Sequence, residues 1–195
     1  MFSGIIEVLE KPIKVEKKPD SLRLTLPVPS QWNVQLGDSI SLDGTCCTVE
    51  TLNGSEMTFF LMAETLKKTT FGAYREDHEI NMEKPLTLNT LIGGHLVSGH
   101  VDTVGTVQSV EENAESKTLS FSIQPEFTKY IIYKGSICIN GVSLTVVSVD
   151  EKSFRVSLIP YTLEHTNLGS LKNGDSVNIE IDLIAKYLEK LVVSK

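Results

Sequence analysis

The chain has 195 residues, a length that fits one large domain or two small ones, and its 18 Lys and Arg against 25 Asp and Glu give a formal net charge of −7. This acidic balance repels the phosphates of nucleic acids and the headgroups of anionic membranes, so neither is an expected partner. A hydrophobic fraction of 41% is enough to fill a folded core.

The cysteines and the first residues favour a cytoplasmic protein. Cys46, Cys47 and Cys138 are odd in number and two are adjacent, which suits neither a disulfide framework nor paired zinc knuckles. Residues 1–7 lack the basic and apolar segments of a secretory signal. No stretch approaches the roughly 18 apolar residues of a membrane span. We therefore expect a reducing, cytoplasmic location.

Alternation of apolar and polar residues predicts β-strands along most of the chain. It is clearest at residues 22–26, 119–123, 154–158 and 177–181. Small polar residues before glycine predict tight turns at residues 43–44, 53–54, 140–141 and 173–174, of which the first and third join closely paired strands. Each half should hold about six short strands. Such strands favour a barrel over a sandwich, because closure removes unpaired edges.

Three segments break the alternation and predict helices. Residues 65–72 and 162–169 each begin with a threonine suited to an N-cap and end at a glycine, so each should form a short helix that closes one barrel end. After Asp182, residues 183–193 predict a helix with Ile184, Tyr187, Leu188 and Leu191 on one face. An isolated helix of this length is marginal in water. The apolar face must therefore pack either on the body of the chain or on copies of itself around a symmetry axis.

The chain contains an internal repeat. Sliding it by 97 residues aligns residues 39–49 with residues 136–146, and the register continues without a gap nearly to the end of both halves. The second predicted strands meet at the same offset, whereas residues 3–7 meet residues 98–102 at an offset of 95. We attribute the difference to a loop between the first and second strands. The duplication predicts barrels over residues 1–90 and 91–182 and a terminal helical segment over residues 183–195.

The repeat also pairs polar residues. Thr48 and Thr145 follow the hairpins of the two halves inside otherwise apolar strands, and Cys46 pairs with Ser143 on the same strand face. A polar side chain that faces into a barrel needs a hydrogen-bond partner, from backbone or ligand, although β-propensity alone also explains a threonine. We expect these four side chains to point inward and to line a pocket in each half.

The two halves differ in one titratable group. The repeat pairs His100 with Ile5, and His100 lies with His95 in the Gly-rich segment that joins the halves. Two histidines without a third ligand do not favour a zinc site, and no nucleophile-elbow motif supports a hydrolytic triad. Two related pockets that differ in one titratable group can bind the same molecule and treat it differently. A reaction between two identical substrates requires this.

Five motifs, spread over nearly the whole chain, are shared with a known family: residues 1–7 (MFSGIIE), 93–100 (GGHLVSGH), 140–146 (NGVSLTV), 159–164 (IP followed by TLE) and 177–182 (VNIEID). By these motifs the chain resembles the riboflavin synthases of the alpha-chain type, a family of lumazine-binding double barrels. The resemblance implies an all-β fold of two tandem six-stranded antiparallel Greek-key barrels and a C-terminal helix that forms a homotrimer.

The resemblance also implies a reaction. Two molecules of 6,7-dimethyl-8-ribityllumazine are dismutated by four-carbon transfer to riboflavin and 5-amino-6-ribitylamino-2,4-pyrimidinedione, the final step of riboflavin biosynthesis. No cofactor or metal is implied. Lumazine synthase is a further protein partner that the resemblance suggests.

In that family the substrates stack between the N-terminal barrel of one subunit and the C-terminal barrel of its neighbour. Carried over position by position, the N-terminal site consists of Gly4, Ile5, Ile6, Cys46, Cys47, Thr48, Phe60, Leu61, Met62, Ala63, Glu64 and Thr65. The C-terminal site consists of Gly99, His100, Val101, Lys134, Ser143, Leu144, Thr145, Ser157, Leu158, Ile159, Pro160, Tyr161 and Thr162.

Four of these residues are the expected catalytic groups. The C7 methyl of the lumazine is acidic because its carbanion delocalises into the ring, so a modest base such as the imidazole of His100 suffices. Ser143 and Thr145 would hydrogen-bond the ring or relay a proton. Cys46 or a water molecule would add reversibly at C7 of the partner lumazine, and strand alternation favours Cys46 over Cys47.

Two other functions are compatible with the pattern. One is a lumazine or flavin carrier of the same superfamily, which binds a chromophore without turnover. The other is a generic small-ligand or oligosaccharide-binding double barrel. The presence of His100, Cys46, Ser143 and Thr145 together favours an enzyme, because a carrier has no use for them.

Overall fold

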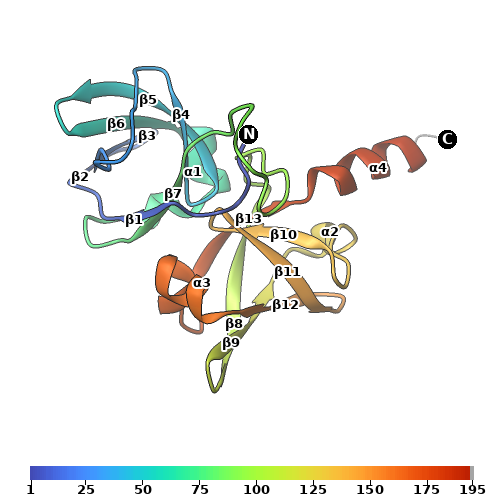
Figure 1. Ribbon diagram of the computed structural model, residues 1–195. Helices are drawn as coiled ribbons and strands as arrows, with labels where there is room; N and C mark the ends of the chain where they lie inside the picture. The colour runs from blue at the N-terminus through green and yellow to red at the C-terminus, as the bar shows by residue number, and fades with distance from the viewer. Residues whose placement is uncertain (194–195) are drawn as a thin grey trace.

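The computed structural model describes residues 1–193 as two curled antiparallel sheets followed by a helix (Figure 1). The N-terminal sheet has the order β1-β7-β4-β5-β6-β3-β2, formed by β1 (Val8–Glu10), β2 (Lys14–Lys18), β3 (Ser21–Pro27), β4 (Ser39–Leu42), β5 (Thr45–Asn53), β6 (Glu56–Met62) and β7 (Ile80–Glu83). The C-terminal strands close a barrel in the order β10-β11-β12-β9-β8-β13, formed by β8 (Thr103–Asn113), β9 (Ser116–Ser122), β10 (Ser136–Ile139), β11 (Val142–Val149), β12 (Ser153–Leu158) and β13 (Ser176–Ile181). The predicted duplicated all-β fold is confirmed, with one difference in the N-terminal half.

Pro12 breaks the first strand of the N-terminal half into β1 and β2, which lie at the two edges of its sheet. The equivalent strand of the C-terminal half, β8, is continuous and pairs with both β13 and β9. Val107, the repeat partner of Pro12, donates its backbone N–H to the carbonyl of Asp175 at 2.8 Å. Proline has no N–H, so the equivalent bond cannot form. The N-terminal strands therefore form a seven-stranded curled sheet, whereas the C-terminal strands form a closed barrel.

The strand registers correct the predicted alignment of the second strands. Leu24 lies opposite Phe59 in one half, and Leu119 lies opposite Val156 in the other. Phe59 and Val156 are repeat partners at an offset of 97, so Leu24 corresponds to Leu119 at an offset of 95. The two-residue change therefore falls between β3 and β4, where the C-terminal half carries the short helix α2 (Pro125–Thr128).

Each half has a short helix after its hairpin, α1 (Ala63–Lys68) or α3 (Pro160–His165), followed by a 3-10 turn, η1 (Thr70–Ala73) or η2 (Asn167–Ser170). The prediction of helices in these segments is confirmed, but their limits are wrong. Thr65 and Thr162 lie inside the helices, where their carbonyls accept bonds at 2.7 Å from the hydroxyls of Thr69 and Thr166. Thr69 and Thr166 have extended backbones, which end the helices before the predicted glycines.

The C-terminal helix α4 (Leu183–Val193) has the predicted bounds, and the carboxylate of Asp182 accepts the N–H of Ile184 at 2.9 Å. Figure 1 shows the helix pointing away from both halves. Its apolar face is exposed, with 62% of Ile184, 64% of Tyr187, 55% of Leu188 and 71% of Leu191 accessible. The body of the chain therefore does not cover this face. The last two residues of the predicted segment, 194 and 195, lie outside the described residues.

Within residues 1–193, no helix has both the length and the apolar character needed to cross a lipid bilayer.

Each half has its own hydrophobic core. Leu24, Phe59 and Met82 are fully buried in the N-terminal core. Phe121 and Phe154 stack at 5.5 Å between ring centroids in the C-terminal core. A third, small cluster of Phe2, Val97, Cys138 and Cys46 joins the two.

The two halves dock on a pseudo-twofold axis that passes through this third cluster. Phe2 and Val97, repeat partners at an offset of 95, exchange backbone hydrogen bonds of 2.7 and 3.0 Å. The turn glycines Gly44 and Gly141 also face each other, and a Cβ on either would lie within 2.8 Å of the other's backbone nitrogen. Each contact joins a residue with its own repeat partner, so the halves associate as two subunits of a symmetric dimer do.

Two buried asparagines fix this arrangement. The side-chain amide of Asn81 donates to the carbonyl of Asn140 at 2.8 Å, and that of Asn178 donates to the carbonyl of Asp43 at 2.9 Å. Each side-chain oxygen in turn accepts a backbone N–H of the other half at 2.8 Å. A rotation of one half against the other would leave these buried groups unpaired, which is costly.

Asp43 breaks the symmetry of this interface, because its repeat partner is Asn140. Its carboxylate is completely buried and accepts the N–H of Asn81 and the side-chain amide of Asn167, each at 2.8 Å, as well as the hydroxyl of Tyr74. Burial raises the pKa of the Asp43 carboxyl to about 7, against the opposing effect of these bonds.

Replacing Asp43 by Asn should stabilise the protein by about 2 kcal/mol at pH 8, with a smaller gain at pH 5. The pKa of Asp43 in the folded state, about 7, is above the ordinary carboxyl value. The folded state therefore binds the proton more tightly than the unfolded state does. The contribution of Asp43 to the free energy of unfolding falls as the pH rises from about 4 to 7. Urea unfolding of both proteins at the two pH values measures the effect. A gain that is equal at both would contradict the assignment.

Candidate functional site

The predicted polar residues of β5 and β11 lie on the outer faces of the two sheets. Cys47 is 6% exposed in the N-terminal core, and burial raises the pKa of its thiol well above the ordinary value. By alternation Cys46 and Thr48 point the other way, and Thr48 is exposed. Ser143 and Thr145 occupy the same outward positions on β11. The preference for Cys46 over Cys47 agrees with this geometry, whereas the expectation that the four polar side chains point inward is wrong.

The other predicted binding residues follow the same alternation. Leu61 and Leu158 have side chains buried in the cores, so only their backbone is available to a ligand. The residues with large exposed apolar side chains are Ile5, Phe60, Met62, Ile159 and Tyr161. Gly4 and Gly99 are buried. The following residues are half-buried or exposed: Ile6, Ala63, Glu64, Thr65, Val101, Lys134, Leu144, Ser157, Pro160 and Thr162. Each half thus presents an open, partly apolar face rather than an enclosed pocket.

The leading segment of each half crosses to the face of the other half. The carbonyl of Gly4 accepts the N–H of Ser143 at 2.7 Å, and the carbonyl of Gly99 accepts the N–H of Cys46 at 2.8 Å. Ile6 packs against the C-terminal core. The predicted grouping is therefore wrong: residues 4–6 belong with the Ser143 face, and residues 99–101 belong with the Cys46 face.

We call these two regions the Cys46 face, formed by residues 46–48, 60–65 and 99–101, and the Ser143 face, formed by residues 143–145, 157–162 and 4–6. The crossing brings His100, the residue after Gly99, to the Cys46 face rather than to Ser143 and Thr145 as predicted. The side chain of His100 is exposed there.

His95 lies against the Ser143 face and was missed by the binding prediction. Its Nδ1 lies 2.7 Å from the hydroxyl oxygen of Ser143. Burial lowers the pKa of His95, which favours the neutral imidazole that can exchange a proton with a hydroxyl. At the offset of 95 His95 has no counterpart among residues 1–90, so the repeat could not indicate it. The signal in the sequence was the pair of glycines before His95. The structure explains the second one, since a Cβ on Gly94 would lie 2.5 Å from the Cβ of Ser143.

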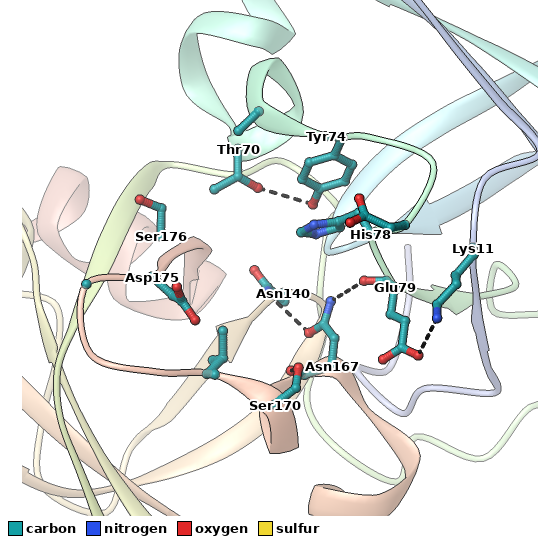
Figure 2. A pocket seen from close by; sticks show the side chains of 14 residues that line it. Lys11, Thr70, Tyr74, His78, Glu79, Asn140, Asn167, Ser170, Asp175 and Ser176 are labelled. Atoms are coloured by element: carbon teal, nitrogen blue, oxygen red, sulfur yellow. Dashed lines mark hydrogen bonds and ion pairs between the residues drawn. The ribbon is translucent and has the colours of Figure 1, made fainter.

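A separate cavity of about 600 Å³ lies between the halves (Figure 2). Polar side chains of both halves line it, among them Tyr74 and His78 of one half and Asn140 and Asn167 of the other. It contains no residue of the Cys46 face or the Ser143 face. The cavity is the solvent side of the Asp43 interface, and the candidate site lies elsewhere.

Comparisons with known proteins agree with this duplicated architecture. The lumazine binding domain family matches the chain twice, over residues 3–85 and 98–182. Crystal structures of LumP complexed with 6,7-dimethyl-8-(1'-D-ribityl) lumazine and with riboflavin superpose with TM-scores of 0.84 and 0.86. They cover 92% and 93% of this chain and 98% and 99% of theirs, and at 24% identity they establish the fold alone. Fold and repeat together define a two-copy lumazine-binding architecture.

Named relatives identify the family within this class of lumazine-binding proteins. Riboflavin synthase of Actinobacillus pleuropneumoniae is 40% identical, over 100% of this chain and 91% of the relative. The riboflavin synthases of Escherichia coli (strain K12) and Bacillus subtilis (strain 168) are 38% and 35% identical, over 93% and 98% of this chain and 87% and 90% of theirs. The chain belongs to the riboflavin synthase family.

The crossing of the segments can be tested at Gly99. This residue has a φ of +84°, and a Cβ on it would lie 2.6 Å from that of Cys46. Gly37 has a similar φ of +86° with nothing within 4 Å, so G37A carries only the backbone cost, about 1 kcal/mol. We expect G99A to lose at least about 2 kcal/mol more than G37A in urea unfolding. Equal losses would show that Gly99 does not lie against Cys46.

Proposed function

We propose that this chain catalyses the dismutation of two 6,7-dimethyl-8-ribityllumazine molecules to riboflavin and 5-amino-6-ribitylamino-2,4-pyrimidinedione. The similarity that extends over the whole chain to riboflavin synthases is the observation that carries the proposal. The reaction is a four-carbon transfer in which one lumazine is donor and the other acceptor. Because the two substrate molecules supply all the transferred atoms and electrons, the chemistry needs no external oxidant or cofactor.

The two faces supply different groups for two copies of one substrate. The Cys46 face has the thiol of Cys46 and His100, where the Ser143 face has the hydroxyl of Ser143 and His95. We propose His100 as the base that removes a proton from the C7 methyl of a lumazine on the Cys46 face. Cys46 or a water molecule adds reversibly at C7 of the partner lumazine, which the carbanion then attacks. Ser143, Thr145 and His95 bind the ring of the second lumazine and relay its protons.

These groups also favour an enzyme over a carrier. A protein that only stores a chromophore needs an apolar surface and hydrogen bonds, and has no use for a neutral imidazole held 2.7 Å from a hydroxyl. The carrier remains the second candidate, because its fold is the same. The two functions differ in turnover alone.

We further propose that the Cys46 face of one protomer and the Ser143 face of another enclose the substrate pair in a homotrimer. Both faces are open and carry exposed apolar side chains, including Phe60 and Met62 on one and Ile159 and Tyr161 on the other. An open face binds a flat ring weakly until a second surface covers it. The exposed stripe of α4 provides a surface for such an assembly.

Incubation of the purified protein with the lumazine alone tests the activity. We expect one riboflavin for every two lumazines consumed, followed by absorbance and confirmed by chromatography of both products. Binding of the lumazine, seen as a fluorescence change, without riboflavin formation would support the carrier instead.

Deletion of residues 183–195 tests the assembly. We expect a folded monomer by sedimentation, with turnover reduced at least about 100-fold because each protomer keeps only half of every site. Circular dichroism of the β-sheet signal serves as the control for folding. A monomer that retains full turnover would contradict a site shared between protomers.

A further inference from the structure

Two buried glutamates hold the crossing segments. Glu180 of β13 accepts the N–H and the hydroxyl of Ser98 at 2.6 and 2.8 Å, the N–H of Gly99 at 2.9 Å and the N–H of His100 at 3.0 Å. Three successive backbone donors thus converge on one carboxylate. They fix the backbone of the segment that carries His100, whose side chain is exposed.

Glu83 of β7 makes the equivalent contacts at the other face. It accepts the N–H and the hydroxyl of Ser3, both at 2.7 Å, and the N–H of Gly4 at 3.0 Å. Both carboxylates are 2% exposed. Burial raises the pKa of each, and the hydrogen bonds oppose that shift by favouring the ionised form. The two clamps are matched in burial and in their bonds to the serine and the glycine, and the Glu180 clamp binds the N–H of His100 in addition.

A second carboxylate connects the Glu180 clamp to the C-terminal helix. Asp102, two residues after His100, accepts the N–H of Ile181 at 2.8 Å and forms an ion pair of 2.6 Å with Lys186 of α4. At the other face Glu7, the repeat partner of Asp102, accepts the N–H of Lys84 at 3.0 Å and pairs with the ammonium of the same lysine at 3.5 Å. Both segments are therefore tied at both ends to their barrels, and the segment that carries His100 is tied to helix α4 as well, through the Asp102–Lys186 pair.

We propose that Glu180 is a positioning residue that holds His100 at the Cys46 face, and that the Asp102–Lys186 pair makes this position depend on helix α4. The proposal rests on the proposed function, because it assigns the effect to the base of that reaction. Glutamine at position 180 would turn an N–H toward backbone N–H donors that need an acceptor, so the segment would shift. Catalysis is sensitive to such small displacements.

The test is a double-mutant cycle between Glu180→Gln and His100→Ala, with Glu83→Gln as the matched control. We expect E180Q to lower kcat at least about 10-fold with KM within about 3-fold, because the clamp holds a base and not a ring-binding group. In the H100A background, E180Q should lower kcat by less than about 2-fold, because the residue that Glu180 positions is gone. E83Q should lower turnover by the same factor in both backgrounds.

Full additivity of E180Q and H100A, as for E83Q, would overturn the proposal and leave Glu180 a purely structural residue. A wild-type protein that forms no riboflavin would instead contradict the proposed function, so the two failures are distinguishable.

Lys186→Met provides a second test that leaves the buried carboxylates intact. We expect K186M to lower kcat about 3-fold or more without loss of the oligomer, and to be non-additive with H100A. Lys152→Met, which removes an exposed charge from the turn between β11 and β12, should leave kcat unchanged. If K186M behaved like K152M, the link from α4 to His100 would be refuted.

Discussion

The reciprocal hydrogen bonds of Asn81 and Asn178 across the pseudo-twofold axis are the constraint on which the rest of the molecule depends. Each amide spans from its own strand to the turn of the opposite half, where Gly44 and Gly141 touch without side chains. Hydrophobic contact alone would allow many relative orientations of two curled sheets, because it has little directionality. Buried amides allow one, since other orientations leave donors and acceptors unpaired. This orientation brings the leading segment of each half within reach of the other's outer face.

Because the segments cross, neither half carries a complete site. The carbonyl of Gly99 pairs with Cys46 and that of Gly4 pairs with Ser143, so each face combines strands of one half with the leading segment of the other. A duplicated gene would otherwise give two equal faces. The crossing delivers His100 to one face and Ile5 to the other, while the linker adds His95 beside Ser143. Two copies of one substrate can then meet two environments, which a dismutation between identical molecules needs.

Much of the fold could be predicted from the sequence, and the grouping of the site could not. Turns such as Asp43–Gly44 and the helix after Asp182 follow from local backbone preferences. A repeat offset shows which residues are equivalent, but not which half they touch, so Gly4 and Gly99 were assigned to the wrong faces. Alternation has a period of two, so the two-residue error at Leu24 kept every side chain on its correct face and stayed invisible. It also cannot tell the inside of a barrel from the outside when both carry apolar residues.

The open faces and the projecting helix have one physical explanation. A face that includes the exposed rings of Phe60 or Tyr161 is costly in an isolated chain, and so is the uncovered stripe of α4. Both costs fall when protomers associate, whereas folding α4 back on its own barrel would cover only the stripe and leave the faces open. The Lys186–Asp102 pair joins α4 to the chain two residues after His100. In the proposed assembly, association that orients α4 also acts on the backbone beside the proposed base, so the same contacts would set both assembly and catalytic geometry.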